Sequence, residues 1–183
     1  MNLSANYFEL FGLPVSFVVD RSVLDRAYRD VQAQVHPDKF AHASDTEQRL
    51  AMQWATQVNE AYTSLKTPLR RARYMLELAG VDAALENNTA MPAAFLIEQM
   101  EWREAVHEAV QAGSLHDVEE LHHRLKNDLA ARYERLSSLL DALNSRKKDD
   151  PAAEAAGEVR KLMFLDKLLH DIDEQLTSLE DAI

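Results

Sequence analysis

The fold is decided by residues 20–66, DRSVLDRAYRDVQAQVHPDKFAHASDTEQRLAMQWATQVNEAYTSLK. Apolar residues recur there at spacings of three and four on either side of a polar segment, which is the pattern of amphipathic helices. They are Leu24, Ala27, Tyr28, Val31 and Val35, followed by Leu50, Trp54, Val58, Ala61, Tyr62 and Leu65. Asp20 is placed to cap the first helix and Pro37 to end it, while Ser44 with Glu47 is a capping-box signature for the second. We predict two long helices that flank a polar loop.

Shorter helices are predicted on either side of this pair. A short helix is indicated by the bulky side chains of Tyr7, Phe8, Leu10 and Phe11, after which Gly12 is a common helix stop. Pro68 is suited to the first position of another helix, which Gly80 closes. The helical periodicity then lapses over residues 81–90, which indicates a linker.

Three further helices are predicted beyond the linker. The first runs from Pro92 to about Gly113, the second begins after Ser114, and the third follows a charged break that ends at Pro151. The apolar seams of the last two are Val118, His122, Leu125, Leu129, Tyr133, Leu136, Leu140 and Leu143, and Val159, Leu162, Leu169, Ile172, Leu176, Leu179 and Ile183. Because short loops join these helices, we expect them to pack as an antiparallel bundle.

The predicted fold is all-α, with an N-terminal domain of residues 1–79, a linker of residues 80–91 and a three-helix bundle of residues 92–183. Charge divides along the same lines. Residues 1–79 contain nine basic and nine acidic side chains, whereas residues 80–183 contain 11 basic and 22 acidic ones, so the net charge of −11 lies in the second part. An acidic surface repels the phosphate backbone, and we therefore expect no nucleic-acid partner.

The composition also excludes several classes of site. The chain has no cysteine, so it has no disulfide, thiol nucleophile or thiolate metal site. It contains no apolar run of the roughly 20 residues that span a bilayer, and its first residues lack a signal-peptide core. We expect a cytoplasmic protein without a membrane partner.

The tripeptide His36-Pro37-Asp38 lies directly after the first long helix, which has Arg26 and Arg29 on its exposed side, and before the second, which contains Asn59-Glu60-Ala61-Tyr62. This arrangement resembles a J-domain, and residues 6–14, NYFELFGLP, resemble the first helix of that family. The resemblance implies a co-chaperone that is not itself an enzyme and that accelerates ATP hydrolysis by a DnaK-like chaperone. The residues expected to contact that chaperone are His36, Pro37, Asp38, Lys39, Arg26, Arg29 and Tyr28. The alternative is a plain interhelical loop.

Physical chemistry explains why this loop suits recognition. Proline disfavours helical geometry at the residue before it, and Asp38 is costly to bury, so its carboxylate stays available to an arginine of another protein. General J-domains carry a denser basic stripe on the helix before the tripeptide. Here Asp25 and Asp30 interrupt the arginines, which favours a dedicated chaperone partner.

A second site is predicted on the helix that begins at Pro92. At about 100° per residue, its core face carries Phe95, Trp102, Val106, Ala109 and Val110. The opposite side carries three aliphatic residues and three acids, Leu96, Ile97, Met100, Glu101, Glu104 and Glu108. Such a patch suits protein binding, although packing against the N-terminal domain or the helix that follows Pro68 would also explain it.

Residues 94–101, AFLIEQME, and 159–168, VRKLMFLDKL, resemble the C-terminal bundle of the HscB family, the J-proteins of bacterial iron-sulfur cluster assembly. The resemblance implies that the bundle binds the scaffold protein IscU and delivers it to the chaperone HscA. Leu96, Ile97, Met100, Glu101, Glu104, Glu108 and Phe164 match the scaffold-binding positions of the family. Phe164 lies next to core position Leu165, so ordinary packing is an alternative for it.

Other constellations are discounted. The cluster of His116, His122 and His123 with Glu119 and Glu120 has metal-ligand chemistry, but neighbouring residues point in different directions on a helix. We find no phosphate-binding or nucleophile motif, and we expect no catalytic residue, metal or cofactor. Two alternatives to scaffold delivery stay open, a general co-chaperone that binds unfolded polypeptides and a purely structural helical protein.

Overall fold

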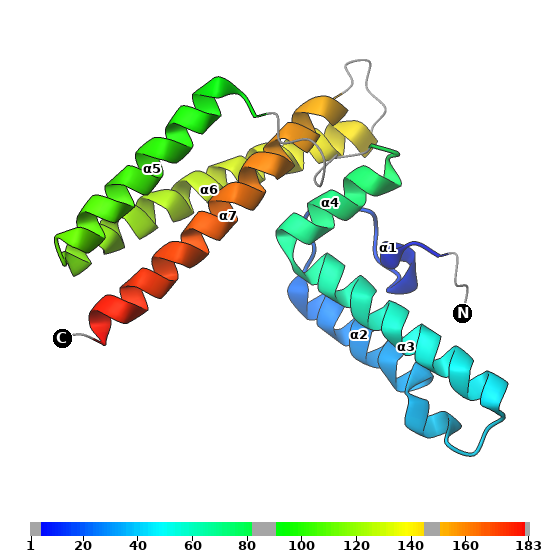
Figure 1. Ribbon diagram of the computed structural model, residues 1–183. Helices are drawn as coiled ribbons and strands as arrows, with labels where there is room; N and C mark the ends of the chain where they lie inside the picture. The colour runs from blue at the N-terminus through cyan, green and yellow to red at the C-terminus, as the bar shows by residue number, and fades with distance from the viewer. Residues whose placement is uncertain (1–4, 82–90, 145–150, 182–183) are drawn as a thin grey trace. The chain divides into compact units, whose positions relative to one another are not determined.

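The computed structural model describes residues 5–81, 91–144 and 151–181, and over these residues it is entirely helical (Figure 1). Its elements are α1 (Tyr7–Leu10), α2 (Arg21–Val35), the 3-10 turn η1 (Pro37–Phe40), α3 (Asp45–Lys66), α4 (Pro68–Leu78), α5 (Ala93–Gln111), α6 (Leu115–Asn144) and α7 (Ala152–Glu180). The chain divides into two compact units, Met1–Met75 and Leu76–Ile183. Most of the predicted linker, residues 82–90, lies outside the described residues.

The first unit is built on the predicted pair of long helices, α2 and α3, which form an antiparallel hairpin (Figure 1). The carboxylate of Asp20 accepts the first free N–H groups of α2, and Ser44 and Glu47 form the predicted capping box of α3. Leu24 of α2 and Val58 of α3 are fully buried, as the apolar spacing predicts. The hairpin is therefore specified by local caps together with one apolar face on each helix.

Helix α1 packs on α3 and joins α4 through an aromatic pair. The rings of Tyr7 and Tyr74 are stacked with centroids 4.1 Å apart, and the Tyr7 N–H donates to the Tyr74 hydroxyl at 2.9 Å. Phe8 is fully buried. Gly12 follows α1 with φ 64°, a backbone conformation that side chains other than glycine rarely adopt. The chain is thereby turned back after a single helical turn.

The second unit contains the predicted three helices, with α6 and α7 antiparallel along their length and α5 beside them (Figure 1). The turn between α5 and α6 follows the expected signals, with Gly113 at φ 64° and the Asp117 N–H donating to the Ser114 hydroxyl at 3.3 Å. The fully buried side chains of α6 and α7 are Val118, Leu125, Leu136, Leu140, Ala155, Val159, Leu162, Leu165 and Ile172. None of the helices in the described ranges is long and apolar enough to cross a membrane.

Three residues of the predicted α7 seam are only partly buried, namely Leu169, Leu176 and Leu179. Leu168 is buried, whereas Leu169, which the spacing favoured, is only partly buried. The seam instead proceeds from Leu165 to Leu168 and Ile172, spacings of three and four that keep these residues on one side of a helix. Ile183, the last predicted seam residue, lies outside the described residues.

Candidate functional site

His36, Pro37 and Asp38 form the corner between α2 and η1. His36 has φ −59° and ψ 126°, extended angles of the kind expected before proline. Its Nδ1 accepts the Asp38 N–H at 3.4 Å and lies 3.5 Å from the Asp38 Oδ2. The His36 side chain is 50% exposed and that of Asp38 is 89% exposed. An imidazole and a carboxylate are thus presented side by side to solvent, with an orientation that the 3-10 turn determines.

Hydrogen bonds hold the chain between this turn and α3. The side-chain amide of Gln48 donates to the carbonyl oxygens of Ala41 at 3.3 Å and Ala43 at 3.1 Å. The Ser44 hydroxyl donates to Glu47 Oε2 at 2.6 Å, and this bond, together with the Ser44 N–H, lowers the pKa of Glu47 below its usual value. The loop is therefore tied to the first turns of α3.

The cations predicted to contact a chaperone are exposed, namely Arg26 and Arg29 on α2 and Lys39 in η1. Arg21, by contrast, is paired, because its Nε donates to Asp25 Oδ1 at 2.7 Å. That hydrogen bond raises the pKa of Arg21 and lowers the pKa of Asp25. The paired arginine supports the interpretation that the basic stripe on α2 is interrupted.

Tyr28, another predicted chaperone contact, is partly buried in the hairpin. Its ring stacks on Tyr62 with centroids 4.1 Å apart. Its hydroxyl donates to Asn59 Oδ1 at 2.9 Å and accepts from the Gln32 amide at 2.9 Å. Tyr28 therefore connects α2 to α3, and a contact with a chaperone stays a prediction for it.

On α5, the predicted outward side is exposed. Leu96, Ile97 and Met100 have 45%, 57% and 70% of their surface accessible, and Phe95 on the opposite side is buried. Glu101, Glu104 and Glu108 are exposed beside the aliphatic side chains. We call these six exposed residues the α5 patch. It presents an apolar centre and three carboxylates on a single helix face, which suits binding to another protein.

Phe164 of α7 lies at the contact between α5 and α7 and is partly buried. Its ring meets the ring of Phe95 edge to face, with centroids 6.1 Å apart. The Arg103 guanidinium lies over the Phe164 ring, 4.8 Å from its centroid. Phe164 therefore packs on Phe95 and Arg103 of α5, as the packing alternative predicts, and stays only partly buried. Its role in scaffold binding stays a prediction.

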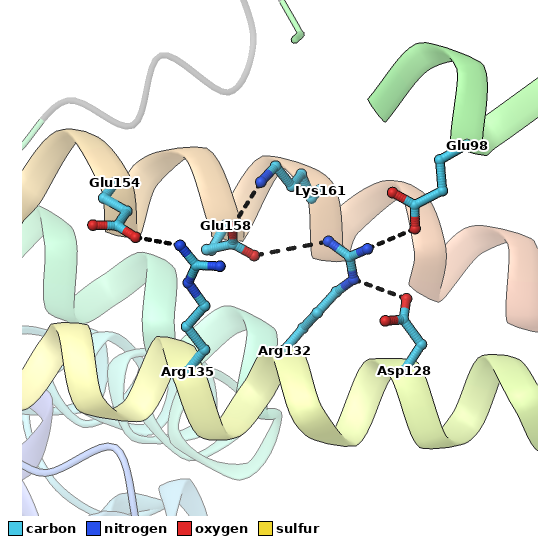
Figure 2. Close-up of polar contacts among 7 residues, drawn as sticks. All are labelled: Glu98, Asp128, Arg132, Arg135, Glu154, Glu158 and Lys161. Carbon is cyan, nitrogen blue, oxygen red and sulfur yellow. Dashed lines mark hydrogen bonds and ion pairs between the residues drawn. The ribbon is translucent and has the colours of Figure 1, made fainter. Parts of the chain in front are cut away.

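A charged network that sequence reasoning missed joins the three helices of the second unit (Figure 2). Arg132 of α6 donates to Asp128 Oδ2 of the same helix at 2.8 Å and to Glu98 Oε1 of α5 at 2.6 Å. Its Nη1 lies 4.0 Å from the Oε2 of Glu158, a carboxylate of α7 that is only 3% exposed. Lys161 donates to Glu158 Oε1 at 2.7 Å. In the sequence, the spacing of four between Asp128 and Arg132 and of three between Glu158 and Lys161 indicates ion pairs within a helix. Such spacings do not indicate that the charges are buried or that they meet across helices.

The histidines of α6 do not form a metal site with their neighbours. His122 Nε2 lies 2.8 Å from Asp173 Oδ1 of α7, and its ring meets that of His123 edge to face. Across the described ranges, no three potential ligands from histidine, aspartate and glutamate come together to hold a metal ion. The His122–Asp173 pair instead connects α6 to α7.

Comparisons with known proteins agree with this architecture. The family model described as the HSCB C-terminal oligomerisation domain matches residues 91–173. The co-chaperone protein HscB homologues of Aromatoleum aromaticum and Cupriavidus taiwanensis are 53% and 51% identical to this chain, over 98% of each chain in both cases. The structure of HscB from Vibrio cholerae is 35% identical, with a TM-score of 0.83 over 96% of this chain and 99% of that one. Human co-chaperone HscB is 30% identical, with a TM-score of 0.83 over 94% of this chain and 83% of its own. The chain belongs to the HscB family of co-chaperones, which combine a J-domain with a C-terminal helical domain.

Proposed function

We propose that this protein binds an IscU-like iron-sulfur scaffold, delivers it to an HscA-like chaperone and stimulates the ATPase of that chaperone, thereby assisting cluster transfer. It does not hydrolyse ATP itself and acts in the cytoplasm, without nucleic acid or membrane as a partner. Residues 1–79 act as the J-domain and residues 92–183 as the scaffold-binding bundle, joined by residues 80–91. The observation that carries the proposal is that one chain exposes both His36 and Asp38, at the corner between α2 and η1, and the α5 patch.

The chaperone half of the proposal rests on the corner between α2 and η1. His36 and Asp38 are exposed and mutually oriented, so a partner can reach both without unfolding any element. Arg26, Arg29 and Lys39 lie on the same two elements and offer cations to an acidic partner. Because Asp25 holds Arg21, long-range attraction is limited and the contacts are of short range. This arrangement suits a dedicated chaperone.

The scaffold half rests on the α5 patch. Exposed aliphatic side chains gain free energy when a partner removes them from water, and a methionine adapts its shape to that partner. The surrounding carboxylates disfavour partners with acidic surfaces and favour those that bring basic groups. We assign Phe164, which is partly buried at the contact between α5 and α7, to the same binding surface.

A second candidate function is self-association through the same patch. The family model that matches residues 91–173 is described as an oligomerisation domain, and Leu96, Ile97 and Met100 are exposed. A second copy would cover these side chains as well as a scaffold would. Scaffold binding and self-association would then compete for one surface.

One experiment separates the alternatives. We would measure ATP turnover by the partner chaperone with this protein, adding either the scaffold or a denatured polypeptide, and would measure the mass of this protein alone by light scattering. Greater turnover with the scaffold, and not with the denatured polypeptide, is the expected result. Equal stimulation by both would indicate a general co-chaperone, and absence of stimulation would contradict the proposal. A dimer that the scaffold dissociates would assign both roles to the patch.

A further inference from the structure

One guanidinium holds both residues that bracket Leu96 and Ile97 in the sequence. Arg132 Nη2 donates to the Glu98 carboxylate at 2.6 Å, and the Arg132 guanidinium lies over the ring of Phe95, 5.7 Å from its centroid. We propose that Arg132 is a positioning residue for the α5 patch, which determines how α5 is rotated on the bundle and hence where Leu96 and Ile97 point. The proposal rests on the function proposed above and names the residue that orients its binding surface.

Helix geometry explains how a contact at Phe95 and Glu98 determines the direction of Leu96 and Ile97. Successive residues are about 100° apart around the axis, so Phe95 and Glu98 lie on neighbouring parts of one face while Leu96 and Ile97 point away from it. A rotation of α5 that released Glu98 would carry the two aliphatic side chains with it. Phe95 also meets Phe164 edge to face, so the same contact places the one predicted scaffold-binding residue that α7 supplies.

Arginine suits this task better than lysine. Each of the three nitrogens of the Arg132 guanidinium faces a different carboxylate (Figure 2). Nη2 faces Glu98 of α5, and Nε faces Asp128 of α6. Nη1 faces Glu158 of α7. Burial lowers the pKa of Arg132, but the hydrogen bonds that it donates to Asp128 and Glu98, with the negative charge of these carboxylates, outweigh burial and raise the pKa overall, so the group stays charged. A lysine would keep the charge near Glu158 but has a single nitrogen, which cannot span the same three partners.

The matched variants are Arg132→Lys and Arg135→Lys. Arg135 lies on the same helix, but it bonds Glu154 of α7 and does not join α5 (Figure 2). Both variants keep the net charge, and neither changes a residue of the patch. Glu98→Gln tests the same contact by changing the acceptor, because it removes the negative charge on α5 to which Arg132 donates.

We would measure affinity for the IscU-like scaffold by calorimetry, and the methyl resonances of Leu96, Ile97 and Met100 by NMR without any scaffold. Arg132→Lys should weaken binding by about tenfold, the loss expected from one coupled interaction, while Arg135→Lys should change it less than about twofold. The methyl resonances should shift in Arg132→Lys and not in Arg135→Lys. Adding Arg132→Lys to Glu98→Gln should cause little further loss, because both act through the same contact.

The outcomes are separable. Unchanged affinity together with unchanged methyl resonances in Arg132→Lys would overturn the positioning role. Additive losses in the double variant would also overturn it, because Arg132 would then act independently of Glu98. If the unsubstituted protein does not bind the scaffold, the proposed function fails, and the methyl resonances alone decide whether Arg132 orients the patch. If Arg132→Lys loses its helical circular dichroism, the scaffold affinity and the methyl resonances of Glu98→Gln test the positioning role instead.

Discussion

Lys161 Nζ lies 2.7 Å from Glu158 Oε1, one turn away on α7, and the Glu158 carboxylate is almost completely buried in the bundle. A buried carboxylate is tolerated only with a close cation, because removal from water disfavours its charge. Arg132, at 4.0 Å, contributes less direct compensation from α6. The bundle therefore contains a buried carboxylate whose charge depends on Lys161, while the lysine itself stays partly accessible.

Lys161→Met should destabilise the bundle by about 3 kcal/mol, because it leaves the Glu158 charge buried without its closest cation. The double variant Glu158→Met/Lys161→Met should recover most of this loss, since both charges are then absent. Urea unfolding followed by Trp102 fluorescence in a Trp54→Phe background reports on this unit. Lys167→Met is the control, because Lys167 is exposed on the same helix. Equal destabilisation by Lys161→Met and Lys167→Met would contradict the prediction.

His36→Gln should abolish ATPase stimulation of the partner chaperone and leave the helical circular dichroism unchanged. The physical reason is that His36 is a half-exposed side chain at a corner, so its loss removes a recognition group and no core packing. Steady-state ATP turnover is the measurement. His42→Gln is the matched control, because it changes an exposed histidine of the same interhelical segment outside the corner. Full stimulation by His36→Gln would reject the J-domain assignment of this corner.

Leu96→Ala/Met100→Ala should abolish scaffold binding while the basal stimulation of the chaperone by the protein alone persists. Both side chains are exposed, so their truncation should change the free energy of unfolding by no more than about 0.5 kcal/mol each. Calorimetric titration with the scaffold measures the loss. Met52→Ala shortens an exposed methionine of α3 and should bind normally. A scaffold affinity that the double substitution leaves intact would exclude the α5 patch as the binding surface.

Acid should destabilise the first unit partly through Glu47. The hydrogen bond from the Ser44 hydroxyl, with that from its N–H, lowers the pKa of Glu47 below the ordinary 4.5. A carboxyl with a lower pKa in the folded state adds stability above its unfolded pKa and loses it as the pH falls through its folded pKa. The free energy of unfolding should therefore decrease below about pH 4.5, and less steeply in Glu47→Gln.

Trp54 fluorescence in a Trp102→Phe background follows this unit alone, because Trp54 lies on α3. Glu60→Gln, which changes another exposed carboxylate of α3, is the control. If the slope of stability against pH is the same in Glu47→Gln as in the parent protein, the capping box does not contribute to acid sensitivity.

Local signals were enough to predict the caps and the helix ends. Asp20, the Ser44–Glu47 box and Pro37 act within three or four residues of their own positions, so their effects do not depend on the rest of the fold. The outward direction of Leu96 and Met100 followed for the same reason, because helical periodicity relates them directly to the buried Phe95. The His36-Pro37-Asp38 corner is also predicted by local sequence, because its position between two amphipathic helices identifies it.

Tertiary packing decided which of several similar residues is buried and which charges meet. Leu168 and Leu169 are chemically identical neighbours, and only the approach of the other helices made Leu168 the core residue. Glu98, Arg132 and Glu158 are 26 or more residues apart along the chain and lie on three different helices, so no local pattern predicts that they converge. The free energy of a charge depends on the dielectric and the partners around it, and only the folded bundle supplies both.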